Sequence, residues 1–544
     1  MPGLLSRERT VARPGFNRWL APPAALAIHL SIGMAYGFSV FWLPLSRAIG
    51  INDPIPCPKD MSFLATLVAD SCDWKVSTLG WIFTLFFVFL GSSAAVFGNW
   101  LERAGPRKAG IFAALCWSGG FMLSALGIYL HQIWMLWLGS GVIGGCGLGL
   151  GYISPVSTLI KWFPDRRGLA TGMAIMGFGG GAMIGSPLAD KLMKYFQTST
   201  SVGVMETFIT LGLIYFIAML CGAFAYRVPP EGWQPAGWTP PAPKDHAMMT
   251  RGNVHLYDAH KTPQFWLLWG VLCLNVSAGI GVLGMASPML QEVFGGKLIG
   301  AQGTLASLDK LSKEEVATMG AAFAALLSLF NIAGRIFWAS LSDYLGRKLT
   351  YFIFFMLGIW LYTAVPFAGH WGKVGLFVAL FSVILSMYGG GFATIPAYLA
   401  DLFGTRFVGA IHGRLLTAWS VAGILGPVLV NYIREFQIDR GVPRAEAYSV
   451  TMFILAGLLW LGLFCNLAVR PVAKRFFMPK EQNFADDKPV GVRANPGPNF
   501  SASTDEAHPS PAGWILVALS WLLVGMPLVW GVSVTLEKAA KLFR

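Results

Sequence analysis

The chain reads Gly98-Asn-Trp-Leu-Glu102-Arg103-Ala-Gly105-Pro106-Arg107-Lys108 after its second long apolar segment, and Ser342-Asp343-Tyr344-Leu345-Gly346-Arg347-Lys348 after its eighth. Each stretch places an acid, a glycine and basic residues at similar spacing. Two related stretches at equivalent places indicate that the chain contains two similar halves. Phe163, Arg166 and Pro187 of the first half also recur, in the same order, as Phe403, Arg406 and Pro427.

Long apolar segments surround these stretches. Of the 544 residues, 55% are hydrophobic and 12% are charged, whereas soluble domains carry about 25% charged residues. Apolar segments of about 20 residues can cross a bilayer, and they must be helical because their backbone groups find no other partners there. We predict spans near 19–45, 77–98, 109–130, 133–160, 169–190, 203–226, 264–290, 317–341, 349–368, 374–400, 414–433, 448–469 and 513–534.

The spans divide the chain into two halves and an extension. The extension begins with a stretch rich in Pro, Asn, Asp and Ser, a composition typical of disorder. We predict an N-terminal tail at 1–18, a six-helix half at 19–226, a linker at 227–263, a second six-helix half at 264–470, a disordered linker at 471–512 and an extra hydrophobic helix within 513–544. A surface-lying position of the last helix stays open.

The net charge of +13 comes mostly from Lys and Arg in the short loops between apolar segments. Such a distribution is a topology signal rather than a nucleic-acid site. Placing the N-terminus in the cytoplasm puts twice as many Lys and Arg on the inner loops as on the outer ones. We therefore predict a multi-pass protein of the inner (plasma) membrane with a cytoplasmic N-terminus and cytoplasmic 1–18 and 227–263.

The two opening stretches resemble the signature loop of the major facilitator superfamily. Four further strings resemble its oxalate:formate antiporter family, which is related to monocarboxylate transporters. They are Lys161 to Gly172, Asn275 to Gly281 with Ala286-Ser-Pro288, Gly389 to Tyr398, and Gly413 to Trp419. The resemblance implies an all-α polytopic membrane protein of two six-helix bundles, with 12 transmembrane helices, to which the extra helix is added. It also implies transport of small carboxylates, by exchange or with protons.

The two signature stretches are predicted to act as gating loops. An acid at one helix end can meet a basic cluster or a neighbouring helix N-terminus, and this contact can break as the halves move. The first copy departs from the pattern, with Glu in place of Asp and Pro106 in place of a base. The predicted gating residues are Glu102, Arg103, Gly105, Arg107, Asp343, Gly346, Arg347 and Lys348.

Arg335 is the strongest candidate for a substrate ligand. It is the one Lys or Arg well inside a predicted span, where an ionised side chain is costly and usually faces a cavity or a partner. Its planar guanidinium matches a carboxylate, and related carriers have a similar arginine on their eighth span. The alternative is an arginine that extends from the inner end of its helix towards water.

The resemblance implies a second cation, a lysine, on the eleventh span of oxalate carriers, where this sequence has Trp419. One buried cation balances one carboxylate, so the substitution favours a monocarboxylate over oxalate. Aromatic and amide groups orient small ligands in apolar sites. Tyr36, Asn275, Tyr388, Trp419 and Tyr152 are therefore the further predicted substrate-binding residues.

His29 lies inside the first span and is the candidate for proton coupling, because histidine titrates near physiological pH. The alternative is a structural histidine bonded to a neighbouring helix. His412 and Arg414 lie near a predicted inner loop, where they are expected to be solvated. Cys57 and Cys72 share the first outer loop, where an oxidising compartment permits a disulfide.

These residues predict a secondary active transporter of small carboxylate anions, favouring formate, acetate, lactate or pyruvate, with proton symport or anion exchange by alternating access. The alternatives are an oxalate/formate antiporter and, in another class, a transporter-like sensor or membrane assembly factor that binds a protein partner through the C-terminal helix. No catalytic constellation, metal-ligand spacing or cofactor motif is present in the sequence. We therefore expect no enzyme activity, cofactor, metal or nucleic-acid partner.

Overall fold

A computed structural model describes residues 5–51, 55–58, 61–74, 76–230, 232–238, 248–250, 252–308, 310–479 and 511–540. Within these residues the chain is helical, and its only extended pairings are isolated bridges. Thirteen helical segments are long and apolar enough to cross a membrane. This confirms the predicted all-α membrane fold of twelve spans and an extra helix. Residues 480–510, most of the predicted disordered linker, lie outside the described residues.

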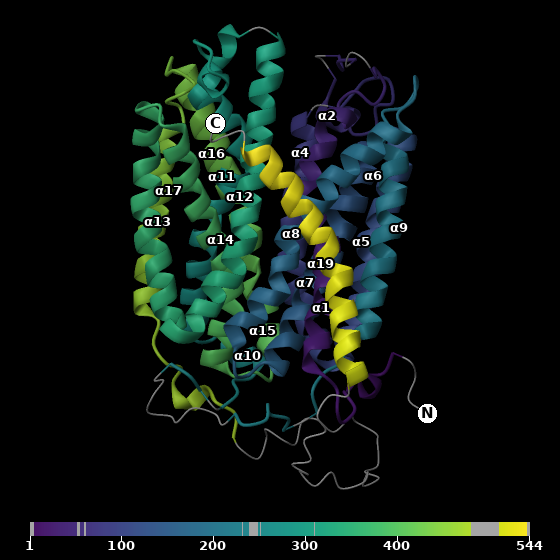
Figure 1. Ribbon diagram of the computed structural model, residues 1–544, viewed down its shortest axis with the longest axis vertical. Helices are drawn as coiled ribbons and strands as arrows, with labels where there is room; N and C mark the ends of the chain where they lie inside the picture. Colours follow the sequence, from purple (N-terminus) through teal and green to yellow (C-terminus); the bar gives the residue numbers. More distant parts are fainter. Residues whose placement is uncertain are drawn as a thin grey trace.

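The N-terminal half contains six spans (Figure 1). Its first span starts with two prolines in the opening turn, where the missing N–H groups cost nothing. The spans are α1 (Ala21–Ile32), continued by the 3-10 segment η3 (Gly33–Phe41) and α2 (Trp42–Leu45); α4 (Val76–Ala104); α5 (Pro106–Tyr129); α6 (Ile133–Leu136), the π-helical η4 (Trp137–Gly144) and α7 (Gly145–Trp162); α8 (Arg167–Phe196); and α9 (Val204–Ala225).

The C-terminal half repeats this arrangement. Its first span begins at Pro263, where the Thr262 side chain accepts a hydrogen bond from Phe265 N and caps the helix. Its spans are α11 (Pro263–Phe294), α12 (Lys310–Leu345), α13 (Arg347–His370), α14 (Val374–Phe403), the broken pair α15 (Val408–Leu415) and α16 (Thr417–Asp439), and α17 (Ser449–Ala468). The short helices α3 (Phe63–Thr66) and α10 (Leu256–Ala259) lie between spans.

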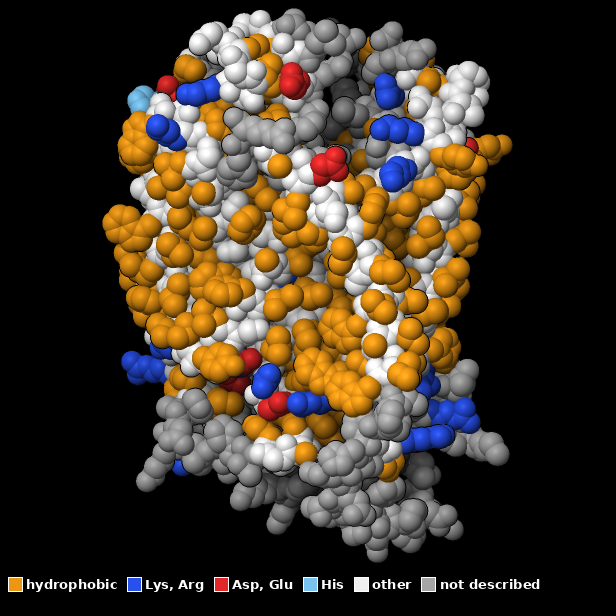
Figure 2. Space-filling model, in the orientation of Figure 1, with side chains coloured by type: hydrophobic (Ala, Val, Ile, Leu, Met, Phe, Trp, Pro, Cys, Tyr) orange, Lys and Arg blue, Asp and Glu red, His pale blue; other side chains and the backbone are white. Residues whose placement is uncertain are grey.

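Hydrophobic side chains cover the middle of the visible face, and charged side chains gather towards its two ends (Figure 2). This is the surface expected of a protein whose middle section is exposed to lipid. We call the end of the bundle where residues 5–20 lie the N-terminal face. The other end, where α2 and the loop after it lie, is the opposite face (Figure 1).

The two halves meet through small residues. Gly168 and Gly172 of α8 face the backbone of Ala339 and Arg335 on α12 so closely that a side chain at either glycine would collide with it. Gly98 of α4 likewise meets Ala410 of α15. Small residues let membrane helices approach closely. The contacts that these glycines make run from the N-terminal face to the middle of the bundle, so the halves are sealed on that side.

The thirteenth span, α19 (Pro511–Ala539), packs on α8, α12 and α1 and therefore touches both halves. Figure 1 shows it as a tilted helix that runs from the N-terminal face to the opposite face. The indole Nε1 of Trp521 donates a hydrogen bond of 3.2 Å to the Trp19 carbonyl. The Lys191 ammonium lies 5.1 Å from the Trp530 ring centre. α19 therefore runs alongside the other spans, and its crossing of the bilayer stays a prediction.

Candidate functional site

Arg335 of α12 is completely buried at the seam between the halves. Its Nε donates a hydrogen bond of 2.9 Å to Oδ1 of Asn331, one turn earlier on the same helix. Its Nη1 donates one of 2.9 Å to the Ile175 carbonyl of α8, in the other half. Its Nη2 is buried and makes no hydrogen bond of normal geometry among the described residues, although the Tyr36 hydroxyl lies close to the guanidinium.

A buried N–H group of a charged side chain without a partner is unusual. Leaving such a group unsatisfied costs about 1–3 kcal/mol or more, and buried charges are normally paired. Nη2 of Arg335 belongs to a guanidinium whose other bonds fix its plane. The arrangement presents a held cation with a free donor, which is what an incoming carboxylate requires.

Three tyrosine side chains lie near this guanidinium. The Tyr36 and Tyr388 hydroxyls come from opposite halves and lie 3.1 Å apart, within hydrogen-bonding distance. Both of them, and the Tyr152 hydroxyl, lie close enough to Arg335 to interact with its charge. The Tyr152 hydroxyl is buried and has no hydrogen-bond partner among the described residues. Hydroxyls of this kind can orient the oxygens of a small anion.

Aromatic rings form the walls around Arg335. Its Cζ lies 5.9 Å from the Phe178 ring centre and 5.7 Å from that of Phe392. The Trp419 ring lies 4.2 Å from Phe392 and 5.3 Å from Tyr152, centre to centre. The indole Nε1 of Trp419 is a further buried donor without a partner in the described structure. Rings that face a guanidinium stabilise its charge and exclude water.

The structure thus brings together Arg335, Tyr36, Tyr152, Tyr388 and Trp419. Sequence reasoning missed Phe178 and Phe392. The sequence does not distinguish a phenylalanine that lines a binding site from one that packs in the hydrophobic core. Asn275 lies elsewhere, in a small pocket inside the C-terminal half. That pocket is lined by Asn275, Gly279, Phe354, Tyr362 and Tyr388, among others. The Oδ1 atom of Asn275 has no hydrogen-bond partner in the described residues.

His29 is buried and fixed by two backbone carbonyls. Its Nδ1 contacts the Ala174 carbonyl of α8, and its Nε2 lies 3.2 Å from the Tyr152 carbonyl of α7. A neutral imidazole has one N–H and can donate to only one of these oxygens. The geometry matches the alternative of a histidine that ties helices together.

The expectation that His412 is solvated is wrong. His412 is fully buried, and neither ring nitrogen has a hydrogen-bond partner among the described residues. Its burial comes from α4 and α7 of the other half, which pack on α15 and which its position near a loop did not reveal. Arg414 is half-buried; its Nη1 donates to the Leu256 carbonyl and contacts His260, each at 3.0 Å.

The second signature loop joins the two halves at the N-terminal face. The Asp343 carboxylate of α12 accepts hydrogen bonds from the backbone N–H groups of Gly168 (2.8 Å) and Leu169 (3.0 Å), in the first turn of α8. It also pairs with Arg347, which bonds Asp401 at 3.1 Å. An acid at a helix N-terminus satisfies unpaired N–H groups and the helix dipole. Lys348 instead bonds the Leu467 and Val469 carbonyls at the end of α17.

The first signature loop makes its ion pair inside its own half. Glu102 accepts hydrogen bonds from the Lys161 ammonium at 2.9 Å and the Ser157 hydroxyl at 3.2 Å, both on α7. Gly105 and Gly346 each precede a helix with positive φ, 87° and 85°, a turn that favours glycine. Arg107 is buried near Phe224, and no contact within the described part of the chain places Arg103 in a gate.

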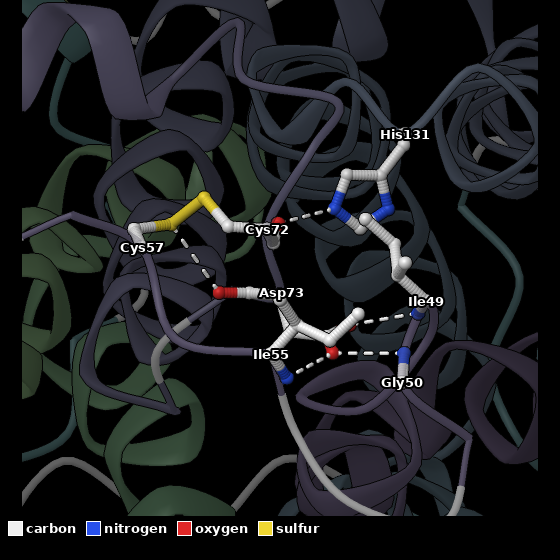
Figure 3. Close-up of a disulfide and its surroundings, with 7 residues drawn as sticks. All are labelled: Ile49, Gly50, Ile55, Cys57, Cys72, Asp73 and His131. Atoms are coloured by element: carbon white, nitrogen blue, oxygen red, sulfur yellow. Dashed lines mark hydrogen bonds between the residues drawn. A yellow bond between two sulfur atoms is a disulfide. The ribbon is translucent and has the colours of Figure 1, made fainter.

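A disulfide joins Cys57 and Cys72 in the loop on the opposite face (Figure 3). The Asp73 carboxylate accepts hydrogen bonds from the backbone N–H groups of Ile49, Gly50 and Ile55 at 2.7–3.0 Å. His131 stacks on Trp74 with ring centres 4.1 Å apart and donates to the Cys72 carbonyl at 2.9 Å. Burial lowers the pKa of His131, while the Cys72 carbonyl and nearby acids oppose that change.

Comparison with known proteins identifies the fold and its relatives. A sequence model described as Major Facilitator Superfamily matches residues 25–427. The chain is 28% identical to the oxalate:formate antiporter of Oxalobacter formigenes over 66% of this chain and 77% of that one. It is 26% identical to human monocarboxylate transporter 11 over 88% and 90%. The E. coli fucose:proton symporter shares the fold, with 12% identity, a TM-score of 0.54 and coverage of 82% and 97%.

Proposed function

This chain belongs to the Major Facilitator Superfamily, and we propose that it carries small monocarboxylate anions such as formate, acetate, lactate or pyruvate. It is a multi-pass membrane transporter and not an enzyme. One observation carries the choice of substrate class: Nη2 of Arg335 is a buried cationic donor that makes no hydrogen bond of normal geometry in the described structure. A carboxylate would complete its hydrogen bonds and balance its charge.

The number of central cations supports a substrate with one negative charge. Among the described residues, the buried basic side chains are Arg107, Arg335 and Arg347, and the first and last lie at helix ends. Arg335 is therefore the buried cation in the middle of a span. Trp419, which stands where oxalate carriers are expected to have lysine, adds a neutral N–H donor. A second carboxylate would be left without a balancing charge in a low dielectric.

Oxalate/formate exchange is the alternative, and the similarity to the oxalate:formate antiporter favours it. In that case a dianion would use Arg335 and the neutral donors Tyr36, Tyr152 and Trp419 together. Hydrogen bonds from neutral groups stabilise an anion less than a charged partner does. We therefore expect oxalate to bind more weakly than lactate or formate.

The transport cycle that we propose is alternating access in the inner (plasma) membrane, with the N-terminus cytoplasmic. The anion enters between the halves and reaches Arg335, and Tyr36 and Tyr388 then lie on either side of it. Asp343 holds α8 against α12 while the N-terminal face is sealed, and this contact breaks when that face opens. Coupling is to a proton or to a counter-transported anion.

Transport by purified protein in proteoliposomes tests the substrate class. We expect wild-type protein to exchange labelled lactate, and Arg335→Gln to abolish this exchange. Arg335→Lys keeps the positive charge but lacks the planar guanidinium that can donate two hydrogen bonds to a carboxylate. It should therefore retain weak exchange with a higher KM. Ser328→Ala, whose hydroxyl donates to the Ala324 carbonyl of its own helix, is the matched control on α12. Full exchange by Arg335→Gln with an unchanged KM would contradict the proposal.

A further inference from the structure

We infer that His412 binds the proton that is transported together with the anion, an inference that rests on the proposed carboxylate function. His412 is the fully buried histidine of α15 whose two ring nitrogens have no hydrogen-bond partner among the described residues. Its ring centre lies 5.9 Å from that of Tyr152, which belongs to the other half of the molecule. Tyr152 in turn lies within range of the Arg335 charge, so the two sites adjoin.

The seam between the halves is what buries His412. Helix α15 packs on α4 and α7 of the N-terminal half through glycines. Gly413, next to His412, meets the Ala94 carbonyl of α4, and Gly409, one turn earlier, meets Ser157 of α7. These contacts belong to the sealed N-terminal side. When that side opens, α15 separates from α4 and α7, and the His412 imidazole becomes accessible to water on that face.

Among the described residues, none of the surrounding ionisable groups forms an ion pair or hydrogen bond with His412. His29 interacts with it electrostatically, and His29 is fixed by two carbonyls. The acids on the helices packed against α15 are already ion-paired, Glu102 with Lys161 and Asp401 with Arg347. Near α10, His260 and Tyr257 face Arg414 instead. Helix α10 also carries Asp258, which pairs with Lys261 at 2.9 Å. The described titratable groups near α15 include Tyr152, His29, Glu102, Lys161, Asp401, Arg347, Arg414, His260, Tyr257 and Asp258.

A proton at His412 also keeps the buried charge constant through the cycle. The empty carrier holds one central positive charge, on Arg335. A bound monocarboxylate neutralises it, and a proton on the His412 imidazole restores a single positive charge. Each additional charge that is buried in the membrane interior is costly. The empty and the doubly loaded carrier therefore meet the same electrostatic cost when the seam closes.

The two histidines can be separated by measuring two kinds of transport. Accumulation driven by a proton gradient needs the proton to bind and dissociate, whereas exchange at equal pH does not need net proton movement. With one proton per anion, a gradient of one pH unit supports about tenfold accumulation of lactate. Exchange of labelled for unlabelled lactate shows that the protein is folded and that Arg335 still binds the anion.

We would test His412→Gln and His412→Asn in proteoliposomes, with His29→Gln as the matched control. We expect both His412 variants to retain exchange near the wild-type rate and to lose gradient-driven accumulation. His29→Gln should retain both. Gradient-driven accumulation by either His412 variant would overturn the inference, as would loss of accumulation in His29→Gln alone. If both His412 variants lose exchange as well as accumulation, His412 acts in anion movement and not in proton coupling, and the inference is wrong.

The wild-type protein separates this inference from the proposed function. If it exchanges lactate but a proton gradient does not drive accumulation, the carboxylate function stands and the role of His412 is wrong. If it moves neither lactate, formate nor oxalate in either assay, the carboxylate function itself fails. The exchange measurement therefore decides which of the two proposals is contradicted.

Discussion

Asn331 lies one helical turn before Arg335 on α12, and its Oδ1 accepts a 2.9 Å hydrogen bond from Nε of the arginine. The amide therefore helps to fix the plane of the guanidinium, together with the bond from Nη1 to the Ile175 carbonyl. We expect Asn331→Leu to raise the KM for lactate about tenfold, because loss of this bond costs about 1.4 kcal/mol in orientation. Initial rates of lactate exchange over a range of concentrations measure this.

Asn331→Asp makes the opposite test at the same position. A carboxylate there would pair with Arg335 and act as a permanent internal anion, so exchange should fall well below that of Asn331→Leu. Ser328→Ala again serves as the control on the same helix. Exchange by Asn331→Asp equal to that of the wild type would show that Arg335 does not need its charge to bind the substrate.

Loss of the Asp343 carboxylate should open the N-terminal face. Asp343→Asn weakens the cap on α8, a contribution of about 1 kcal/mol. Spin labels at the exposed positions Arg166 and Tyr344, one in each half, report the separation of that face. We expect longer distances in Asp343→Asn. Glu102→Gln, whose charge is paired within one half, should leave the distances unchanged; equal lengthening in both variants would contradict the asymmetry.

The disulfide should stabilise the loop on the opposite face. Its cysteines are separated by 15 positions, and closing a loop of that length is worth up to about 3 kcal/mol. We expect the double variant Cys57→Ser/Cys72→Ser to unfold at a lower temperature in detergent. Reduction of the wild type should have a similar effect and should not change the double variant further. An unchanged Tm in both cases would contradict the expectation.

Acid should loosen the same loop through His131, which lies outside the spans. Its pKa is lowered in the folded protein, so the neutral form favours folding. That contribution is complete above the unfolded value of about 6.5 and falls as the pH drops through 6.5 towards the folded pKa. Protection against hydrogen exchange in residues 61–74, taken relative to the intrinsic exchange rate at each pH, should therefore fall below about pH 6.5.

His131→Asn is the matched variant for this measurement. Asparagine tolerates the left-handed backbone at this position, where φ is 49°. It does not titrate, so the protection factors of the loop, corrected for the intrinsic exchange rate, should no longer change between about pH 5 and 8. A dependence that persists in His131→Asn would assign the effect to another group.

Removal of residues 471–544 separates a carrier from a sensor or assembly factor. α19 covers the seam from outside the twelve-span body, and Leu516, Leu519 and Leu523 on it are exposed. We expect the truncated protein to retain lactate exchange and to lose thermal stability. Trp530→Ala, which removes one side chain of α19 and its contact with the Lys191 ammonium, should have a smaller effect on stability. Complete loss of exchange in a folded truncated protein would favour the other class of function.

Much of the fold could be predicted because membrane spans depend on one property, apolar length. The breaks inside spans could not be predicted in the same way. α15 and α16 separate at Leu416 and the first span tightens into η3, although neither α15 nor η3 contains a proline. Their shape depends on contacts with the other half, and no local residue pattern records those contacts.

Arg335 could be found from the sequence because a charge in an apolar span is costly and therefore informative. Phe178 could not, because its role appears only when α8 is placed against α12. His412 shows the same limit. His412 lies near a predicted loop in the sequence, which predicted exposure to solvent. The helices that cover His412 come from 250 or more positions earlier in the sequence. Burial is a property of the assembled halves.

α19 is a thirteenth candidate span, so residues 5–20 and the end of α19 lie at opposite ends of the bundle (Figure 1). We therefore expect a reporter fused to the N-terminus and one fused after α19 to occupy different compartments. Fluorescent proteins that mature only in the cytoplasm and enzymes that are active only outside it should give complementary signals at the two ends. Any purification tag, biosensor or surface-display fusion made from this protein must be planned around that polarity.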